Sequence, residues 1–268
     1  FRSGKKCCCT VICGHSSFYW IVSRWADENG FERKRNFMIQ ISNLSKKYGE
    51  TVVFSDLNYT FENACIYGLV GRNGAGKTTL LNILSNYDKN YTGVISIDRK
   101  KMNKVDYLDM PVAYAMDQPS FFNELTIYEN LLLIASSRKI KKQEAFDKIE
   151  RILDGLGLKK YENYSPLELS KGTMQRLNNA CAMIQEEKIT IFDEPFSGLD
   201  PVQMKLLENV IVEFHKKEKG IYIISSHDIE CLQNVCDKCL LLHNGQIREI
   251  NMEEVDREEI AKILSEGE

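Results

Sequence analysis

The sequence lacks any long hydrophobic run. Apolar segments such as residues 131–135 stay far below the roughly 18 consecutive apolar residues that a transmembrane helix needs. The sequence therefore predicts no membrane-spanning helix. Since 43% of the 268 residues are hydrophobic, the chain is instead able to bury a sizeable core.

An excess of positive charge is also missing. The 35 lysines and arginines are outnumbered by 38 aspartates and glutamates, which leaves a formal net charge of −3. Proteins that bind nucleic acid carry a basic patch or stripe as their electrostatic footprint. The composition therefore predicts that nucleic acid is not a partner.

Nine cysteines do not indicate a secreted protein here, because those after residue 37 suit buried, reduced thiols. Cys65 and Cys181 fall on apolar strands or helix faces. Cys231, Cys236 and Cys239 raise the question of zinc, but Cys236 and Cys239 run from a helix end into a strand, so we expect no zinc there. In the first 37 residues, Cys7-Cys8-Cys9-x3-Cys13 leaves a metal site open as an alternative.

Residues 1–37 differ in composition from the rest of the chain. They hold seven Lys or Arg against three Asp or Glu, a charge of +4, whereas the remainder totals −7. We expect this segment to be a non-native or disordered upstream extension, translated in frame before Met38. The nucleotide sequence tests this: a purine-rich ribosome-binding block before codon 38 supports it, and an authentic start before Phe1 contradicts it. The main domain is then expected at 38–268.

A glycine-rich segment, residues 71–79, completes the pattern G-x-x-x-x-G-K-[ST]. The apolar run 64–70 before it suits a buried strand, and the apolar residues after it follow helical spacing. Backbone N–H groups at such a strand-to-helix turn converge on phosphate oxygens, the lysine adds a point charge, and the hydroxyl faces Mg²⁺. The sequence therefore predicts a nucleotide-phosphate site made by Asn73, Gly74, Ala75, Gly76, Lys77, Thr78 and Thr79.

Alternating strand and helix segments predict an α/β fold with a mostly parallel sheet. Further apolar strands are expected at 188–192, followed by Asp193 and Glu194, and at 221–224, followed by His227. Ligands in such sheets bind at the carboxyl ends of the strands. Between about 118 and 185 the pattern becomes helical and predicts an inserted helical subdomain, in which a helix beginning at Met174 follows Ser170.

Further motifs make the chain resemble the ABC transporter ATPases between about Met38 and Gly245. Asp193 and Glu194 end a strand that resembles Walker B. Residues 169–173, Leu-Ser-Lys-Gly-Thr, look like a variant of the LSGGQ signature, with Lys171 and Thr173 departing from it. The remaining matches are Gln118 in the Q-loop, Ser197-Gly198-Leu199-Asp200 in the D-loop, His227 as the switch histidine and Tyr48 as the adenine-stacking aromatic.

The resemblance implies a P-loop core with an N-terminal antiparallel β region, an inserted helical subdomain at about 118–185 and a short tail at about 250–268. ATP and Mg²⁺ are the implied cofactors. Tyr48 would stack on adenine, and Thr78, Gln118 and Asp193 would serve the metal. Glu194, His227 and Gln118 are the implied catalytic residues. Ser170, Gly172 and Asp200 would bind nucleotide from the facing subunit of a head-to-tail dimer.

The resemblance also implies partners. Separate transmembrane permease subunits would form the channel, and the ATPase would lie on the cytoplasmic face of the membrane as a homodimer or heterodimer. The signature variant and the segment Glu-Pro-Phe-Ser-Gly-Leu-Asp-Pro look similar to bacterial exporters of peptides, antibiotics and drugs. Two alternatives stay open: a non-transport ABC ATPase, although about 120 residues between Gly71 and Asp193 leave no room for a long coiled coil, and a nucleotide-dependent regulatory scaffold.

Overall fold

The computed structural model of the chain describes residues 37–105 and 110–251. Of the expected upstream extension 1–37, only Phe37 falls in these ranges. Of the expected tail 250–268, only Ile250 and Asn251 do, and the rest of both segments lies outside the described residues.

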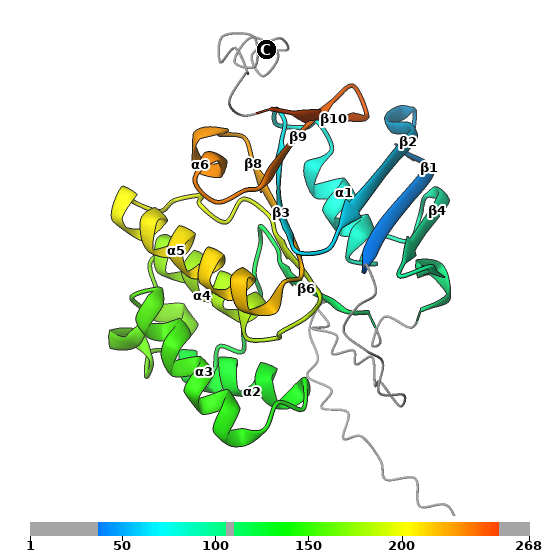
Figure 1. Cartoon of the computed structure of the whole chain (residues 1–268). Coiled ribbons are helices and arrows are strands. Elements are labelled where there is room, and N and C mark those ends of the chain that lie inside the picture. The colour runs from blue at the N-terminus through cyan, green and yellow to red at the C-terminus, as the bar shows by residue number, and fades with distance from the viewer. Residues whose placement is uncertain (1–36, 106–109, 252–268) are drawn as a thin grey trace, which may run out of the picture.

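A six-stranded sheet forms the centre of the molecule (Figure 1). Its order is β10-β9-β3-β8-β7-β6, with parallel pairing from β6 to β9 and antiparallel pairing of β10 with β9. The carboxyl ends of five parallel strands therefore meet at one edge. The strands are β3 (Cys65–Val70), β6 (Val112–Ala115), β7 (Ile189–Phe192), β8 (Ile221–Ser226), β9 (Lys238–His243) and β10 (Gln246–Ile250).

The central strands are buried on both faces because their side chains alternate between two cores. In β3, Ile66 and Val70 join one apolar cluster, whereas Tyr67 and Leu69 join the other. This is the two-residue period of a β-strand, expressed here in a strand that is apolar throughout. The nearly continuous apolar runs in the sequence are thus explained by a sheet with both faces covered.

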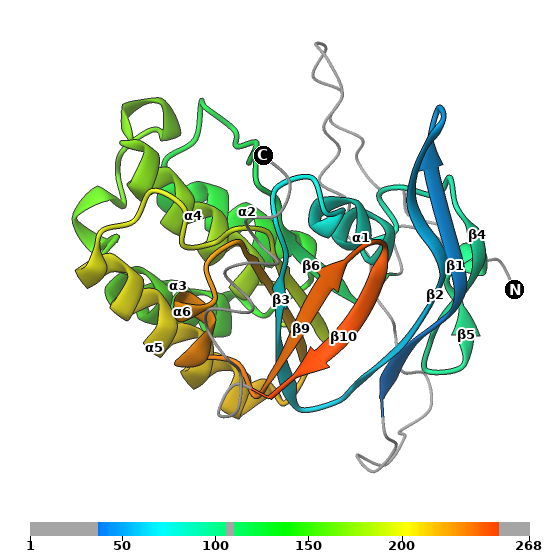
Figure 2. The ribbon, with the colours of Figure 1, turned by 90° about the horizontal axis from the view of Figure 1, so that it is seen from above.

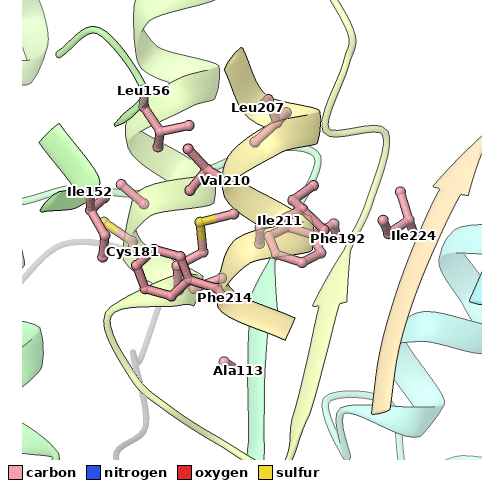
Figure 3. Close-up of a cluster of buried hydrophobic side chains, with 14 of the residues drawn as sticks. Ala113, Ile152, Leu156, Cys181, Phe192, Leu207, Val210, Ile211, Phe214 and Ile224 are labelled. Carbon is pink, nitrogen blue, oxygen red and sulfur yellow. The ribbon is translucent and has the colours of Figure 1, made fainter. Parts of the chain in front are cut away.

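Helices cover one face of this sheet, as Figures 1 and 2 show. Figure 3 shows Cys181, Phe192, Val210 and Ile224 meeting in their shared core, with contributions from both helices and strands. These helices are α2 (Ile127–Ser137), α3 (Lys142–Gly155), α4 (Lys171–Met183), α5 (Pro201–Glu218) and α6 (Glu230–Gln233), with single turns η3 (Lys159–Tyr161) and η4 (Pro166–Glu168).

The opposite face of the sheet is covered by α1 (Lys77–Leu84), which lies between it and a second, antiparallel sheet (Figure 2). Phe54 and Ile95 from that second sheet share one apolar cluster with Leu80 from α1. Its order is β2-β1-β4-β5. The elements are β1 (Met38–Tyr48), β2 (Thr51–Glu62), β4 (Thr92–Ile97), β5 (Lys100–Lys101) and the turn η1 (Met102–Lys104).

The fold class expected from the sequence is confirmed: a mostly parallel core sheet, an N-terminal antiparallel sheet and an inserted set of helices between β6 and β7. One boundary was wrong. The helix expected from Met174 begins at Lys171, because the Ser170 side chain accepts a hydrogen bond from the Thr173 N–H and so caps the helix three residues earlier. Cys65 and Cys181 are buried free thiols, in agreement with the prediction.

Candidate functional site

The glycine-rich loop joins β3 to α1, as the sequence predicted. Gly76 stands at the N-cap of α1 with φ +101°, and a Cβ there would lie 2.7 Å from the Cγ1 of Val53. Only glycine fits this combination of backbone angle and close approach. The first N–H groups of α1 have no partner within the helix, so the loop presents donors at the positive end of a helix dipole. That arrangement suits an anion.

Lys77, the first residue of α1, is buried under this loop. Its Nζ donates a hydrogen bond to the Gly71 carbonyl oxygen at 2.7 Å and lies 3.4 Å from the Oε1 of Glu194. The ammonium is therefore held between the loop and the acidic end of β7. A positive charge fixed at this point complements the N–H donors of the loop.

Asp193 follows β7 and is fully buried. Its Oδ1 accepts a hydrogen bond from the Ser225 Oγ at 2.6 Å, and its Oδ2 lies 3.4 Å from the hydroxyl of Tyr114. Burial raises the pKa of the Asp193 carboxyl, and hydrogen bonds with Ser225 and Thr78 oppose that rise. The structure thus brings two of the three residues predicted to serve a metal, Thr78 and Asp193, into contact.

Ser225 and Tyr114 are functional neighbours that the sequence analysis missed. They come from β8 and β6, the strands on either side of β7. Their approach to Asp193 depends on the strand order, which no local pattern specifies. The one local signal is the position of Ser225 two residues before His227.

Glu194 has a left-handed backbone, with φ +49°. Its N–H donates to the Ser225 Oγ at 2.9 Å, and its carbonyl oxygen accepts from the Gln175 Nε2 at 3.2 Å, so the surroundings hold this unfavourable conformation. The Oε2 of Glu194 lies 3.0 Å from the Nδ1 of His227, whose side chain is 60% exposed. The carboxylate is therefore aimed between Lys77 and His227.

These groups surround a cavity of about 540 Å³. Tyr48, from the end of β1, forms part of the wall; its hydroxyl donates to the Asp88 Oδ2 at 3.1 Å, and the Lys46 Nζ lies 4.4 Å from its ring centroid. Half of Tyr48 is exposed, so a ring face is available to a planar ligand. The complete lining is Tyr48, Thr51, Val53, Arg72, Asn73, Gly74, Gly76, Lys77, Thr78, Thr79, Asp117, Glu194, Ser197 and His227.

Several predicted residues are not in this lining. Gln118 lies in the bend after β6, is exposed and does not line the cavity. The residue of this bend that does line the cavity is its neighbour Asp117. Asp193 lies behind the wall, bonded to its neighbours as described, and Ala75 is in the loop without lining the cavity. The predicted signature residues Ser170 and Gly172 and the D-loop residue Asp200 are likewise not part of the wall.

The signature and D-loop segments lie against one another instead. A Cβ on Gly172 would lie 2.9 Å from the carbonyl oxygen of Gly198, so the two backbones touch. Ser170 is exposed, with its Oγ 2.9 Å from the Oγ1 of Thr173. Asp200 caps α5 by accepting from the Gln203 N–H at 2.9 Å. The two segments together form an exposed surface at two helix N-termini.

No helix within residues 37–105 and 110–251 is long and apolar enough to cross a membrane.

The chain matches known proteins over most of its length. The ABC transporter family model matches residues 54–197. The bacitracin transport ATP-binding protein BcrA of Enterococcus faecalis is 30% identical over 82% of this chain and 71% of its own length. The tungstate uptake system ATP-binding protein TupC of Peptoclostridium acidaminophilum is 30% identical over 79% of this chain and 97% of its own.

A solved structure, described as the ATP binding subunit of an ABC transporter, is 27% identical and superimposes with a TM-score of 0.73, covering 84% of this chain and 94% of that one. The fold, the phosphate loop and these matches agree. The chain belongs to the ABC transporter family, as one of its ATP-binding ATPase proteins.

Proposed function

We propose that this chain is the peripheral ATP-hydrolysing subunit that drives separate transmembrane subunits from the cytoplasmic face of a membrane. The observation that carries the proposal is the contact chain at the phosphate loop, in which Glu194 Oε1 lies 3.4 Å from Lys77 Nζ and Glu194 Oε2 lies 3.0 Å from His227 Nδ1. It places a cation for phosphate, a carboxylate and an imidazole around one cavity.

The phosphate loop and Lys77 would hold the nucleotide. The N–H groups of Asn73, Gly74, Ala75, Gly76, Lys77, Thr78 and Thr79 suit the β- and γ-phosphates, because they lie at or beside the N-terminus of α1. Lys77 adds the charge, and Tyr48 at the other side of the cavity offers its ring to adenine. The distribution of donors and ring supports a nucleoside triphosphate rather than inorganic phosphate.

Thr78 and Asp193 would hold Mg²⁺. The donor set fits this ion, which takes oxygen ligands and is bound in proteins by one or two carboxylates together with substrate phosphates. When bound, Mg²⁺ neutralises charge on the phosphates. The contact between Thr78 and the Asp193 carboxyl supports the assignment, since two oxygen ligands already lie together.

Glu194 would polarise the attacking water, and His227 would help to position the γ-phosphate. The left-handed backbone of Glu194 directs its carboxylate to Lys77 and His227, where a water can approach the terminal phosphate. Most of the rate gain would come from positioning and charge stabilisation. Gln118, the third catalytic residue expected from the sequence, is exposed and stays a prediction.

A second ABC ATPase chain, identical or different, would complete each site. Ser170 and Gly172 begin α4 and Asp200 caps α5, and these residues are absent from the wall of the cavity in their own chain. The exposed N-termini of α4 and α5 do not line the cavity at the phosphate loop of their own chain. They are therefore available to a nucleotide that is held by another chain. This supports a head-to-tail dimer with ATP at the interface.

A groove of about 190 Å³ beside the bend after β6 would receive the transmembrane subunits. Its apolar walls come from Phe121, Phe122, Leu133 and Ile134. Phe122 and Leu133 are 44% and 42% exposed and line the same groove, so they offer apolar surface to a partner. The groove follows Gln118 and Pro119 directly in sequence, so a partner seated there is coupled to the bend that borders the nucleotide cavity.

We further propose export of a peptide, antibiotic or drug as the transport reaction. The similarity to a bacitracin transport ATPase supports it, and the equally similar tungstate uptake ATPase supports import. The neighbouring genes separate the two. A multi-helix membrane protein with a long extracellular loop is expected for export, whereas a gene for a solute-binding protein beside this one would contradict it.

Steady-state phosphate release by the purified chain tests the proposed function. We expect Mg²⁺-dependent release from ATP that grows more than in proportion to protein concentration, because two chains form each site. ATP binding without turnover, alone and with the membrane subunits, would favour the regulatory scaffold instead.

Asp193→Asn should weaken the dependence on Mg²⁺. The amide keeps the shape and the hydrogen bond from Ser225 but loses the negative charge that attracts the cation. Because losing even an outer-shell partner of a metal ligand typically costs about 10–100-fold in metal affinity, we expect the Mg²⁺ concentration at half-maximal turnover to rise by at least about tenfold. A metal titration identical to the wild type would show that Asp193 is not a ligand.

A further inference from the structure

The bend that joins β6 to α2 sends one polar side chain into the nucleotide cavity, and that side chain is Asp117. Gln118, the next residue, is exposed like Asp117 but does not contribute to the cavity wall. Both residues lie in the bend after β6, and of the two only Asp117 lines the cavity.

Two features fix the bend in this orientation. The carbonyl oxygen of Met116 accepts a hydrogen bond from the Asn178 Nδ2 at 2.7 Å, which ties the bend to the middle of α4. Pro119 disfavours helical backbone at the residue before it, which is Gln118. The backbone is therefore restricted before Asp117 and at Gln118.

Asp117 also lies in the electrostatic field of the metal side of the site. The strand before it, β6, pairs with β7 so that Ala115 is opposite Phe192, and the Asp193 N–H donates to the Ala115 carbonyl oxygen at 2.9 Å. Asp117 is thus two residues beyond a register pair that ends next to Asp193. In agreement with this proximity, the charge of Asp117 contributes to the raised pKa of Asp193, after the larger effect of burial.

We propose that Asp117, and not Gln118, is the residue of this bend that faces Mg²⁺ and the terminal phosphates. The inference rests on the proposed nucleotide site and deepens it. A carboxylate in this place differs from an amide in one respect that can be measured. It attracts Mg²⁺ directly or through a bound water, and without Mg²⁺ it repels the triphosphate. Asp117 therefore makes nucleotide affinity depend more strongly on Mg²⁺ than an amide would.

The oxygen donors present at this site suit Mg²⁺. Within the described ranges no group of three His, Cys, Asp or Glu side chains is arranged as a metal cage. Mg²⁺ seldom uses such a cage, since it keeps several waters and takes one or two carboxylates plus substrate phosphates. Asp193 and Asp117, with the Thr78 hydroxyl, supply that smaller set.

The test is binding of a fluorescent, non-hydrolysable ATP analogue, titrated with Mg²⁺ and in EDTA. Wild type is compared with Asp117→Asn, which has nearly the same shape, and with Gln118→Ala as the neighbouring control. For Asp117→Asn we expect the Mg²⁺ concentration at half-maximal binding to rise by about tenfold or more, with equal or tighter binding in EDTA. Gln118→Ala should keep the Mg²⁺ concentration at half-maximal binding of the wild type. A purely structural loss would weaken binding equally with and without Mg²⁺.

Wild-type metal dependence in Asp117→Asn would overturn the inference, and so would a loss confined to Gln118→Ala. If the wild type binds the analogue, either result rejects the role of Asp117 but leaves the proposed nucleotide site standing. If the wild type binds no analogue with or without Mg²⁺, the proposed function fails as well. Asp117→Glu serves as the rescue variant, because a longer carboxylate should restore part of the Mg²⁺ dependence that Asp117→Asn loses.

Discussion

Glu194→Gln is expected to abolish turnover and to trap an ATP-bound dimer. The amide has nearly the shape of the carboxylate, so the contacts of the Glu194 backbone with Ser225 and Gln175 should survive. The attacking water loses its base, and general-base catalysis typically contributes about 10²–10⁴-fold in rate. Because ATP then persists at the interface and binds the dimer better than the monomer, it shifts association by mass action.

The measurement is sedimentation velocity of Glu194→Gln with ATP, with ADP and without nucleotide. We expect a dimer with ATP only, and a monomer in the other two conditions. Wild type shows less dimer because hydrolysis empties it. Glu124→Gln, an exposed substitution of the same kind, should behave as the wild type. A Glu194→Gln protein that keeps wild-type turnover would remove the proposed role of Glu194.

The second large effect is expected for Lys77→Ala, which should lose most nucleotide binding. The buried Lys77 Nζ is fixed by the Gly71 carbonyl oxygen beneath the phosphate loop, so the substitution removes a positive charge that is held in place at the site. A charged hydrogen bond contributes about 1.5–3 kcal/mol, which corresponds to an affinity lower by about tenfold to a hundredfold. Equilibrium titration with a fluorescent ATP analogue measures this loss.

Two controls make the Lys77 result specific. Lys104→Ala removes an exposed lysine outside the cavity and should leave affinity unchanged. Thermal unfolding without nucleotide shows whether Lys77→Ala is folded, since Glu194 loses a neighbouring cation. Unchanged affinity together with unchanged turnover in a folded Lys77→Ala would refute the site.

Local patterns were sufficient to predict the elements that carry the phosphate site. The run before Gly71 forms β3 and the apolar spacing after Gly76 forms α1, because both depend only on neighbouring residues. The order of motifs likewise predicted a mostly parallel sheet with Asp193 and His227 after its strands. Sequence spacing is informative here because parallel strands bring their carboxyl ends to one edge.

Contacts between distant segments could not be predicted in this way. The bonds of Asp193 with Ser225 and Tyr114 arise from the order of β6, β7 and β8, which the sequence does not state. The choice between Asp117 and Gln118 depends on the direction of a bend that Asn178, some 60 residues later, holds in place. The motif identified the bend, and its prediction of Gln118 as the functional residue stays a prediction beside the proposal for Asp117.

Buried charged residues could not be predicted from local sequence patterns either. Lys148 lies on the apolar face of α3, only 1% exposed, with its Nζ 2.6 Å from the Glu186 Oε1. Helical periodicity predicts apolar residues on the buried face of such a helix and gives no reason to place a lysine among them. Its position follows from a partner in the segment before β7, which becomes a neighbour only after folding.

The central claim is that each nucleotide site combines the phosphate loop of one chain with Ser170 and Gly172 of another. Mixing two variants in the Glu194→Gln background tests it most directly: one carries Lys77→Ala and the other Ser170→Arg. Each alone should stay monomeric with ATP, because every site in its dimer is damaged. An equimolar mixture forms one intact site per heterodimer, so sedimentation velocity should reveal an ATP-dependent dimer that ADP does not support. A mixture that remains as monomeric as its two components, across the concentrations at which Glu194→Gln alone dimerises and above them, would contradict the shared site.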